Sequence, residues 1–101
     1  RYTGRAASPG TPDIIGNSKN GLACYIEAKA PGCRNGSNLR PQQREFLTRK
    51  IQTECFAVCA DSAAYVENTW NHFISLPPQE RIEYLLKELP QHNPRQLKLD
   101  F

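Results

Sequence analysis

The chain lacks any long, uninterrupted hydrophobic run. Hydrophobic residues make up 39% of its 101 residues and charged residues 23%, but no apolar stretch approaches the roughly 20 residues that a membrane-spanning helix needs. The sequence shows no signal-peptide pattern, no internal repeat and no low-complexity stretch. Because it begins with Arg1 rather than methionine, we expect further residues upstream. These features favour one soluble globular domain over 1–101 and argue against a membrane-embedded or repeat protein.

Histidine is scarce, and the cysteines lack metal-binding spacing. His72 and His92 are isolated, and His72 lies in an aromatic-rich segment where a structural role is expected. The cysteines are Cys24, Cys33, Cys55 and Cys59. Three of them lie in apolar runs, where free cysteine behaves as a small buried hydrophobe, and no zinc-finger spacing is present. We expect reduced thiols and hence a cytoplasmic, intracellular protein. Two disulfides in a small secreted module are the alternative that the even count leaves open.

The chain also carries little excess charge of either sign. The net charge is +3 and the isoelectric point is near 8.8. A mildly basic surface suits a partner with a phosphate backbone, such as DNA, but does not require one.

Hydrophobic periodicity predicts a mixed α/β domain. β-Branched residues before a glycine predict a strand over 13–16, and Asn20-Gly21 predicts a tight hairpin to a second strand. The other predicted elements are strands over 1–6, 22–29 and 55–60, and helices over 41–53, 62–75 and 79–89. The order β-β-β-α-β-α-α implies a small mixed sheet with helices packed on it and a crossover helix before the last strand. The domain then divides into a core (1–60), two C-terminal helices (61–90) and a tail (91–101).

Three charged residues stand at the ends of the two predicted hairpin strands. Asp13 begins the first strand, and Glu27 and Lys29 end the second. Side chains on a strand alternate between its faces, so Glu27 and Lys29 point the same way. Two carboxylates can hold a hard cation such as Mg²⁺, and the lysine can orient a water molecule near a phosphate. The alternatives are a turn-capping role for Asp13 and a solvated strand face that carries the other two.

The wider context of these residues resembles the VRR-NUC family of the PD-(D/E)xK nuclease superfamily. That family's pattern is G-x-PD followed by two apolar residues, then E-V-K, then L-S-x-x-Q at a helix start before an aromatic residue. The matching segments are Gly10-Thr11-Pro12-Asp13-Ile14-Ile15, Ile26-Glu27-Ala28-Lys29 and Leu39-Arg40-Pro41-Gln42-Gln43, with Phe46. The match spans about residues 1–60 and implies a restriction-endonuclease-like core. It also suggests a stand-alone, bacterial or phage-encoded member that is similar to Holliday junction resolvases.

The resemblance implies roles for individual residues. Asp13, Glu27 and the backbone carbonyl of Ala28 would bind Mg²⁺ or Mn²⁺, Lys29 would position the attacking water, and Gln43 would steer that water or the phosphate. An ordinary helix-surface role is the alternative for Gln43. Candidate DNA contacts are Arg5, Arg34, Arg40 and Arg44.

The chain departs from the family pattern in two places. PD-(D/E)xK folds usually begin with a helix that often supplies a further acidic residue, and no such helix precedes Gly10. The family commonly turns with glycine before the last strand, where this chain has Thr53-Glu54.

The expected function is metal-dependent, structure-selective endonucleolytic cleavage of branched DNA by a homodimer. Helices 62–75 and 79–89 carry apolar stripes beyond what a small sheet needs, which makes them the candidate dimer surface. The alternative is a catalytically inactive nucleic-acid-binding or protein-interaction domain with the same fold.

Overall fold

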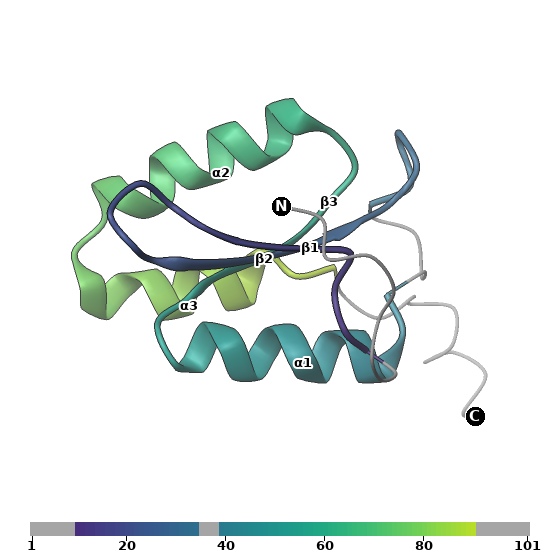
Figure 1. The fold of residues 1–101 in the computed structure, drawn as a ribbon, viewed down its shortest axis with the longest axis horizontal. Helices are drawn as coiled ribbons and strands as arrows, with labels where there is room; N and C mark the ends of the chain where they lie inside the picture. Colours follow the sequence, from purple (N-terminus) through teal and green to yellow (C-terminus); the bar gives the residue numbers. More distant parts are fainter. Residues whose placement is uncertain (1–9, 35–38, 91–101) are drawn as a thin grey trace, which may run out of the picture.

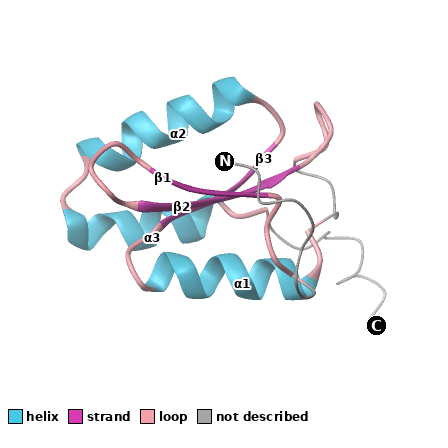
Figure 2. Cartoon of the chain, viewed as in Figure 1, coloured by secondary structure: helices cyan, strands magenta, loops and turns pink. Residues whose placement is uncertain are grey.

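The computed structural model describes residues 10–34 and 39–90. These residues form three strands and three helices (Figures 1 and 2). In chain order they are β1 (Ile14–Asn17), β2 (Ala23–Ala28), α1 (Pro41–Gln52), β3 (Phe56–Ala60), α2 (Ala63–Ser75) and α3 (Pro78–Glu88). The α/β class predicted from the sequence is confirmed. The strand expected over 1–6, the start of the core (1–60) and the tail (91–101) lie outside the described residues. No helix within the described ranges is long and apolar enough to cross a membrane.

The sheet is mixed, with strand order β1-β2-β3. β1 pairs antiparallel with β2, and β2 pairs parallel with β3. Parallel neighbours need a long crossover connection, which α1 supplies. Ser18 and Gly21 make the tight turn between β1 and β2: the Ser18 N–H donates to the Leu22 carbonyl at 2.8 Å, and Gly21 adopts φ +90°. The predicted hairpin is therefore present, and its glycine holds the positive φ that disfavours other residues.

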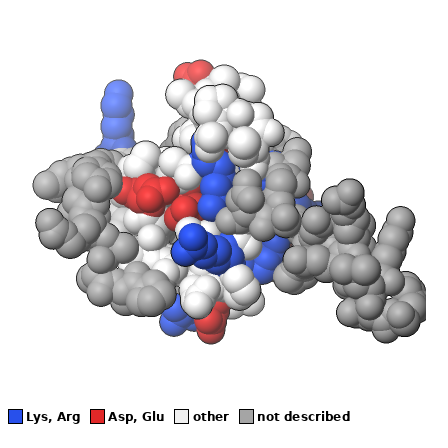
Figure 3. All heavy atoms as spheres, turned by 90° about the vertical axis from the view of Figure 1, so that its right-hand side faces the viewer, with Lys and Arg blue, Asp and Glu red and all other residues white. Residues whose placement is uncertain are grey.

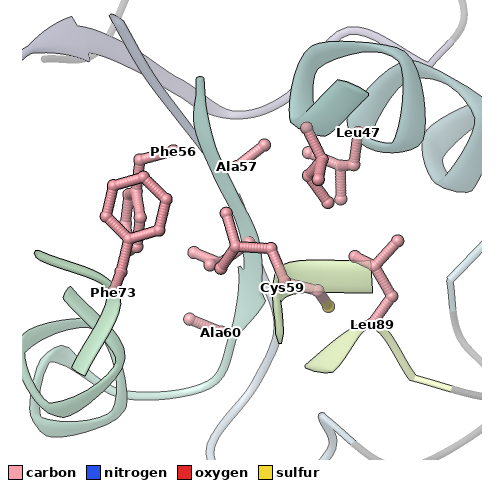
Figure 4. Packing of buried hydrophobic residues seen from close by; sticks show 10 residues of the cluster. Leu47, Phe56, Ala57, Cys59, Ala60, Phe73 and Leu89 are labelled. Atoms are coloured by element: carbon pink, nitrogen blue, oxygen red, sulfur yellow. The ribbon is translucent and has the colours of Figure 1, made fainter. Parts of the chain in front are cut away.

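Helices cover the two faces of the sheet unequally. α1 and α2 lie on opposite sides of it (Figure 2), and α3 contacts β3 and both other helices. Every residue of β3 is buried, as expected for a parallel strand with helices on both faces. Phe56 and Phe73 pack on the α2 side, whereas Leu47, Cys59 and Leu89 pack on the other (Figure 4).

The apolar stripe of α3 packs largely against the rest of the chain. Leu85 and Leu89 from its apolar stripe are 1% and 3% exposed and belong to the core. The expectation that this stripe forms part of a dimer surface is therefore wrong for these residues, because burial in the monomer leaves them no surface to offer. All four cysteines are free thiols, and Cys59 is buried in the same core.

The turn from α1 to β3 adopts the conformation that usually calls for glycine. Glu54 has φ +69°, its N–H donates to the Ile51 carbonyl, and the Cys55 N–H donates to the Lys50 carbonyl. These two bonds form a Schellman motif, in which a left-handed residue ends the helix. Glu54 stands where the VRR-NUC pattern commonly has glycine, and its left-handed backbone conformation is therefore strained.

Candidate metal-dependent active site

The hairpin register brings Asp13 and Glu27 together. Ile14 pairs with Ile26, so the next position outward sets Asp13 opposite Glu27. Directly opposed residues of an antiparallel pair share a face, with Cβ atoms about 5 Å apart. Asp13 is fixed there by the Ala28 N–H, which donates to its Oδ2 at 3.0 Å. The two carboxylates that the sequence singled out therefore lie side by side at the end of β2.

Glu27 is a buried carboxylate with an incomplete set of partners. It is 4% exposed, and its Oε2 accepts a hydrogen bond from Gln43 Nε2 at 2.9 Å. Its Oε1 is buried and has no hydrogen-bond partner among the described residues. Such an atom is uncommon in native proteins and calls for an explanation, for which a missing ion is one candidate.

Lys29 and Gln43 complete the cluster. Lys29 Nζ donates to Gln43 Oε1 at 3.3 Å and lies 3.7 Å from Glu27 Oε2. Gln43 Oε1 also accepts from the Arg40 N–H at 2.9 Å, which ties the start of α1 to its third residue. The inward orientation of Gln43 is thus present, and a surface role is excluded because both ends of its amide contact the two charged residues.

Gly10 holds the segment before β1 against the start of α1. It has φ +89°, and a methyl group in place of its hydrogen would lie 2.6 Å from the Gln42 carbonyl oxygen. Only glycine permits both the backbone conformation and this close approach. Because Asp13 follows three residues later, this contact helps to place the carboxylate beside Glu27.

The electrostatics of the cluster favour a cation. Burial and the nearby charge of Asp13 raise the pKa of Glu27 to about 7, while Lys29 lowers it in part. Two carboxylates that share a site resist ionisation, and a bound divalent cation would relieve both the repulsion and the desolvation. The cluster of Asp13, Glu27 and Lys29 therefore has too little positive charge to offset both carboxylates when both are ionised.

The donors present fit Mg²⁺ or Mn²⁺. The N–H and C=O of one strand residue point to the same edge, so the carbonyl of Ala28 faces the side on which Asp13 lies. Asp13 Oδ1, Glu27 Oε1 and this carbonyl would supply hard oxygen ligands of the kind Mg²⁺ prefers. Within the described ranges, no three His, Cys, Asp or Glu side chains gather as a metal-binding group. Water would therefore complete the coordination, as is usual for Mg²⁺.

Arg34 does not belong to this site. Its Nε donates to the Cys59 carbonyl at 2.8 Å, and its Nη2 donates to Tyr65 Oη and to the Glu88 carbonyl. Its guanidinium lies 4.1 Å from the Tyr65 ring centroid. With 13% of its side chain exposed and an ion pair to Glu88, it anchors the loop after β2 to α2 and α3. The donor groups of Arg34 serve these internal partners, and the contact of Arg34 with DNA stays a prediction.

Two of the other predicted DNA contacts stand at the start of α1. Arg40 is exposed and Arg44 is half-buried one turn later, on the helix that also carries Gln43. The end of the molecule that holds the site shows acidic side chains beside basic ones (Figure 3). Arg5 lies outside the described residues.

Sequence reasoning missed the role of Asp61. Ser62 caps α2, since its Oγ accepts from the Tyr65 N–H. Asp61 Oδ2 instead accepts from the N–H groups of Gly32 and Arg34 at 3.1 and 3.4 Å. It therefore holds the loop after β2, next to the site. Its place directly after a buried strand was the only signal in the sequence.

Comparison of the chain with protein-family models, with curated proteins and with solved structures finds no match. The functional argument therefore depends on the residues and their geometry.

Proposed function

We propose that this chain is a Mg²⁺- or Mn²⁺-dependent endodeoxyribonuclease of the VRR-NUC type, with a restriction-endonuclease-like core. Its substrate would be branched DNA such as a Holliday junction, which has two equivalent scissile strands and therefore suits a homodimer. The observation that carries the proposal is the buried, unpartnered Oε1 of Glu27, opposite Asp13 and next to Lys29 and Gln43.

The reaction is hydrolysis of a phosphodiester: a water oxygen forms a bond to phosphorus as one ester oxygen leaves. A bound divalent cation would stabilise the charge that develops on the phosphate and help to activate water. Asp13, Glu27 and the Ala28 carbonyl would hold it. Lys29 would orient the attacking water and offset negative charge near the phosphate.

Gln43 would act as a positioning residue. Its amide contacts Glu27 on one side and Lys29 on the other, so it keeps the ligand and the cationic group in one geometry. Positioning of this kind matters because small displacements of reacting groups reduce rates strongly.

The surroundings of the site support an anionic substrate. The parallel strands β2 and β3 end on the same side of the sheet as the starts of α1 and α2 (Figure 1). Ligands of open α/β sheets bind beyond the carboxyl ends of the strands, and helix N-termini favour phosphate groups. Arg40 and Arg44 would contact the DNA backbone there without reading its sequence.

Cleavage of a synthetic four-way DNA junction, assayed with Mg²⁺, Mn²⁺ or EDTA, tests the proposal. We expect metal-dependent cleavage that falls at least a hundredfold in Glu27→Gln and in Lys29→Met. Lys87→Met is the matched control, because its side chain is 75% exposed in a surface ion pair with Glu83 and its loss should leave cleavage unchanged.

Junction binding without cleavage in either metal would refute the nuclease proposal and favour the inactive DNA-binding alternative. Absence of both binding and cleavage would favour a protein-interaction domain.

A further inference from the structure

Two aromatic rings lie next to the candidate site, between β2 and α1. Tyr25 precedes Glu27 by two residues on β2, so it shares the face of Glu27 and lies about 7 Å from it along the strand. Phe46 follows Gln43 by nearly one turn of α1. The two rings meet edge to face, with their centroids 5.7 Å apart. The aromatic pair is therefore a direct neighbour of the groups that would hold the metal ion and the scissile phosphate.

Two cationic side chains lie over these rings. The Lys50 ammonium is 5.1 Å from the Tyr25 ring centroid and 5.4 Å from the Phe46 ring centroid. The Arg49 guanidinium is 6.0 Å from the Phe46 centroid. Within the described ranges, neither Lys50 nor Arg49 forms an ion pair with a carboxylate. Their charge is therefore available to an anionic partner.

The aromatic pair is only partly covered by the fold. Tyr25 and Phe46 are both half-buried. Among the described elements, α1 contacts β2 and β3 but not β1, so it does not cover Ile15, which lies opposite Tyr25 in the hairpin register. A cavity of about 540 Å³ lies against the hairpin, and Ile15 and Tyr25 line it. A planar group thus has space beside the Tyr25 ring.

We propose that the aromatic pair and the two cations above it form a stacking subsite for one unpaired nucleotide of the DNA, beside the phosphodiester that is cleaved. Any base can stack on an aromatic ring, while lysine and arginine contact the phosphates that flank it. A base inside a duplex is already stacked on its neighbours, so only a base released at a branch can use the subsite. This inference rests on the proposed function and names the feature of branched DNA that the protein selects.

The position of Lys50 is compatible with this role. Its ammonium group covers the rings in the free protein, and its four-carbon stem is flexible. When a base takes its place on the rings, the ammonium group can move to a neighbouring phosphate. The strand would then run from Glu27 and Lys29 along β2 and α1, because both rings lie on the same side of the site.

Fluorescence anisotropy in EDTA measures DNA binding without cleavage. The full chain is titrated into a forked duplex with unpaired nucleotides at the fork, and into a fully paired duplex with the same number of phosphates. We expect the wild type to bind the fork about tenfold more tightly, and Tyr25→Leu and Phe46→Leu to lose most of this preference. Tyr25→Phe keeps the ring and should keep the preference. Tyr84→Leu, which removes a half-buried ring on α3, is the matched control and should keep it too.

Two further measurements separate stacking from a merely structural role. 2-Aminopurine at the unpaired position loses fluorescence when it stacks, so the wild type should quench it and Tyr25→Leu should not. Lys50→Gln should lower the slope of log K against log salt by about 0.7, the value for one phosphate of a single strand. Circular dichroism melting verifies that each variant is folded. Phe46 and Lys50 lie outside the hydrophobic core cluster, so their variants remain informative if Tyr25→Leu unfolds the chain.

Equal affinity of the wild type for fork and duplex, an absence of quenching, or ring variants that fold and keep the fork preference would each overturn the stacking subsite. Junction cleavage in Mg²⁺ and Mn²⁺ is recorded separately. Fork preference and quenching without cleavage would count against the nuclease proposal alone. Cleavage without fork preference would count against the stacking subsite alone.

Discussion

Replacing Glu27 by glutamine should make the protein more stable at high pH while abolishing cleavage. The native pKa of Glu27 is about 7, against an ordinary value of 4.5. The folded state therefore keeps this proton over a pH range in which the unfolded chain has lost it. Stability from this group is complete below pH 4.5 and is lost as the pH rises through 7. Above that range the fold contains a buried charge that it does not fully compensate.

The size of the effect follows from the shift. At about 1.4 kcal/mol per pKa unit, a rise from 4.5 to about 7 corresponds to about 3 kcal/mol. Asp13, which contributes part of the shift, is exposed, so solvent screening reduces this value. We expect Glu27→Gln to exceed the wild type by about 2 kcal/mol in free energy of unfolding at pH 8, and by much less at pH 5.

Urea denaturation in EDTA, at both pH values and at a fixed protein concentration, measures this difference. Glu45→Gln removes an exposed carboxylate from α1 and should show no such pH dependence. Saturating Mg²⁺ at pH 8 should stabilise the wild type but not Glu27→Gln, because only the native carboxylate cluster binds it. The reasoning is refuted if Glu27→Gln destabilises the protein at pH 8, or if its effect is the same at both pH values.

Three further substitutions test the surrounding structure. Gly10→Ala should lower stability by about 2 kcal/mol, through its clash with α1 and its positive φ, and should reduce cleavage; an unchanged melting temperature would contradict this. Glu54→Gly should raise stability by about 1 kcal/mol in urea titrations by removing left-handed strain, without affecting cleavage; a loss of stability would show that the strain is not relieved. Gln43→Leu should reduce kcat for junction cleavage at least tenfold while the chain stays folded. Wild-type kcat would show that the contacts of Gln43 with Glu27 and Lys29 do not serve catalysis.

Most of the secondary structure could be predicted because its signals are local. The periodicity of 62–75, the hairpin signal at Asn20-Gly21 and the continuous apolar run before Asp61 each depend on residues close in sequence. The observed α2, the β1–β2 turn and β3 agree with these predictions to within one or two residues. The alternation along β2 also predicted correctly that Glu27 and Lys29 share a face, because a period of two is a property of the strand itself.

The candidate site was only partly predictable. Sequence identified Asp13, Glu27, Lys29 and Gln43 by type and spacing, and the structure brings these four residues together. The same local reasoning could not predict the internal contacts of Arg34, because its partner Glu88 is 54 residues away.

By itself the sequence determined which chemical groups the protein has and which helices and strands its segments prefer, since both are encoded within a few neighbouring residues. Only the tertiary structure decided that Glu27 is buried with an unpartnered oxygen, that Arg34 is an internal anchor and that α2 lies beside β3 but not beside β1 or β2. These properties depend on how segments far apart in the chain pack together, and hence on strand register and helix placement that no local pattern specifies.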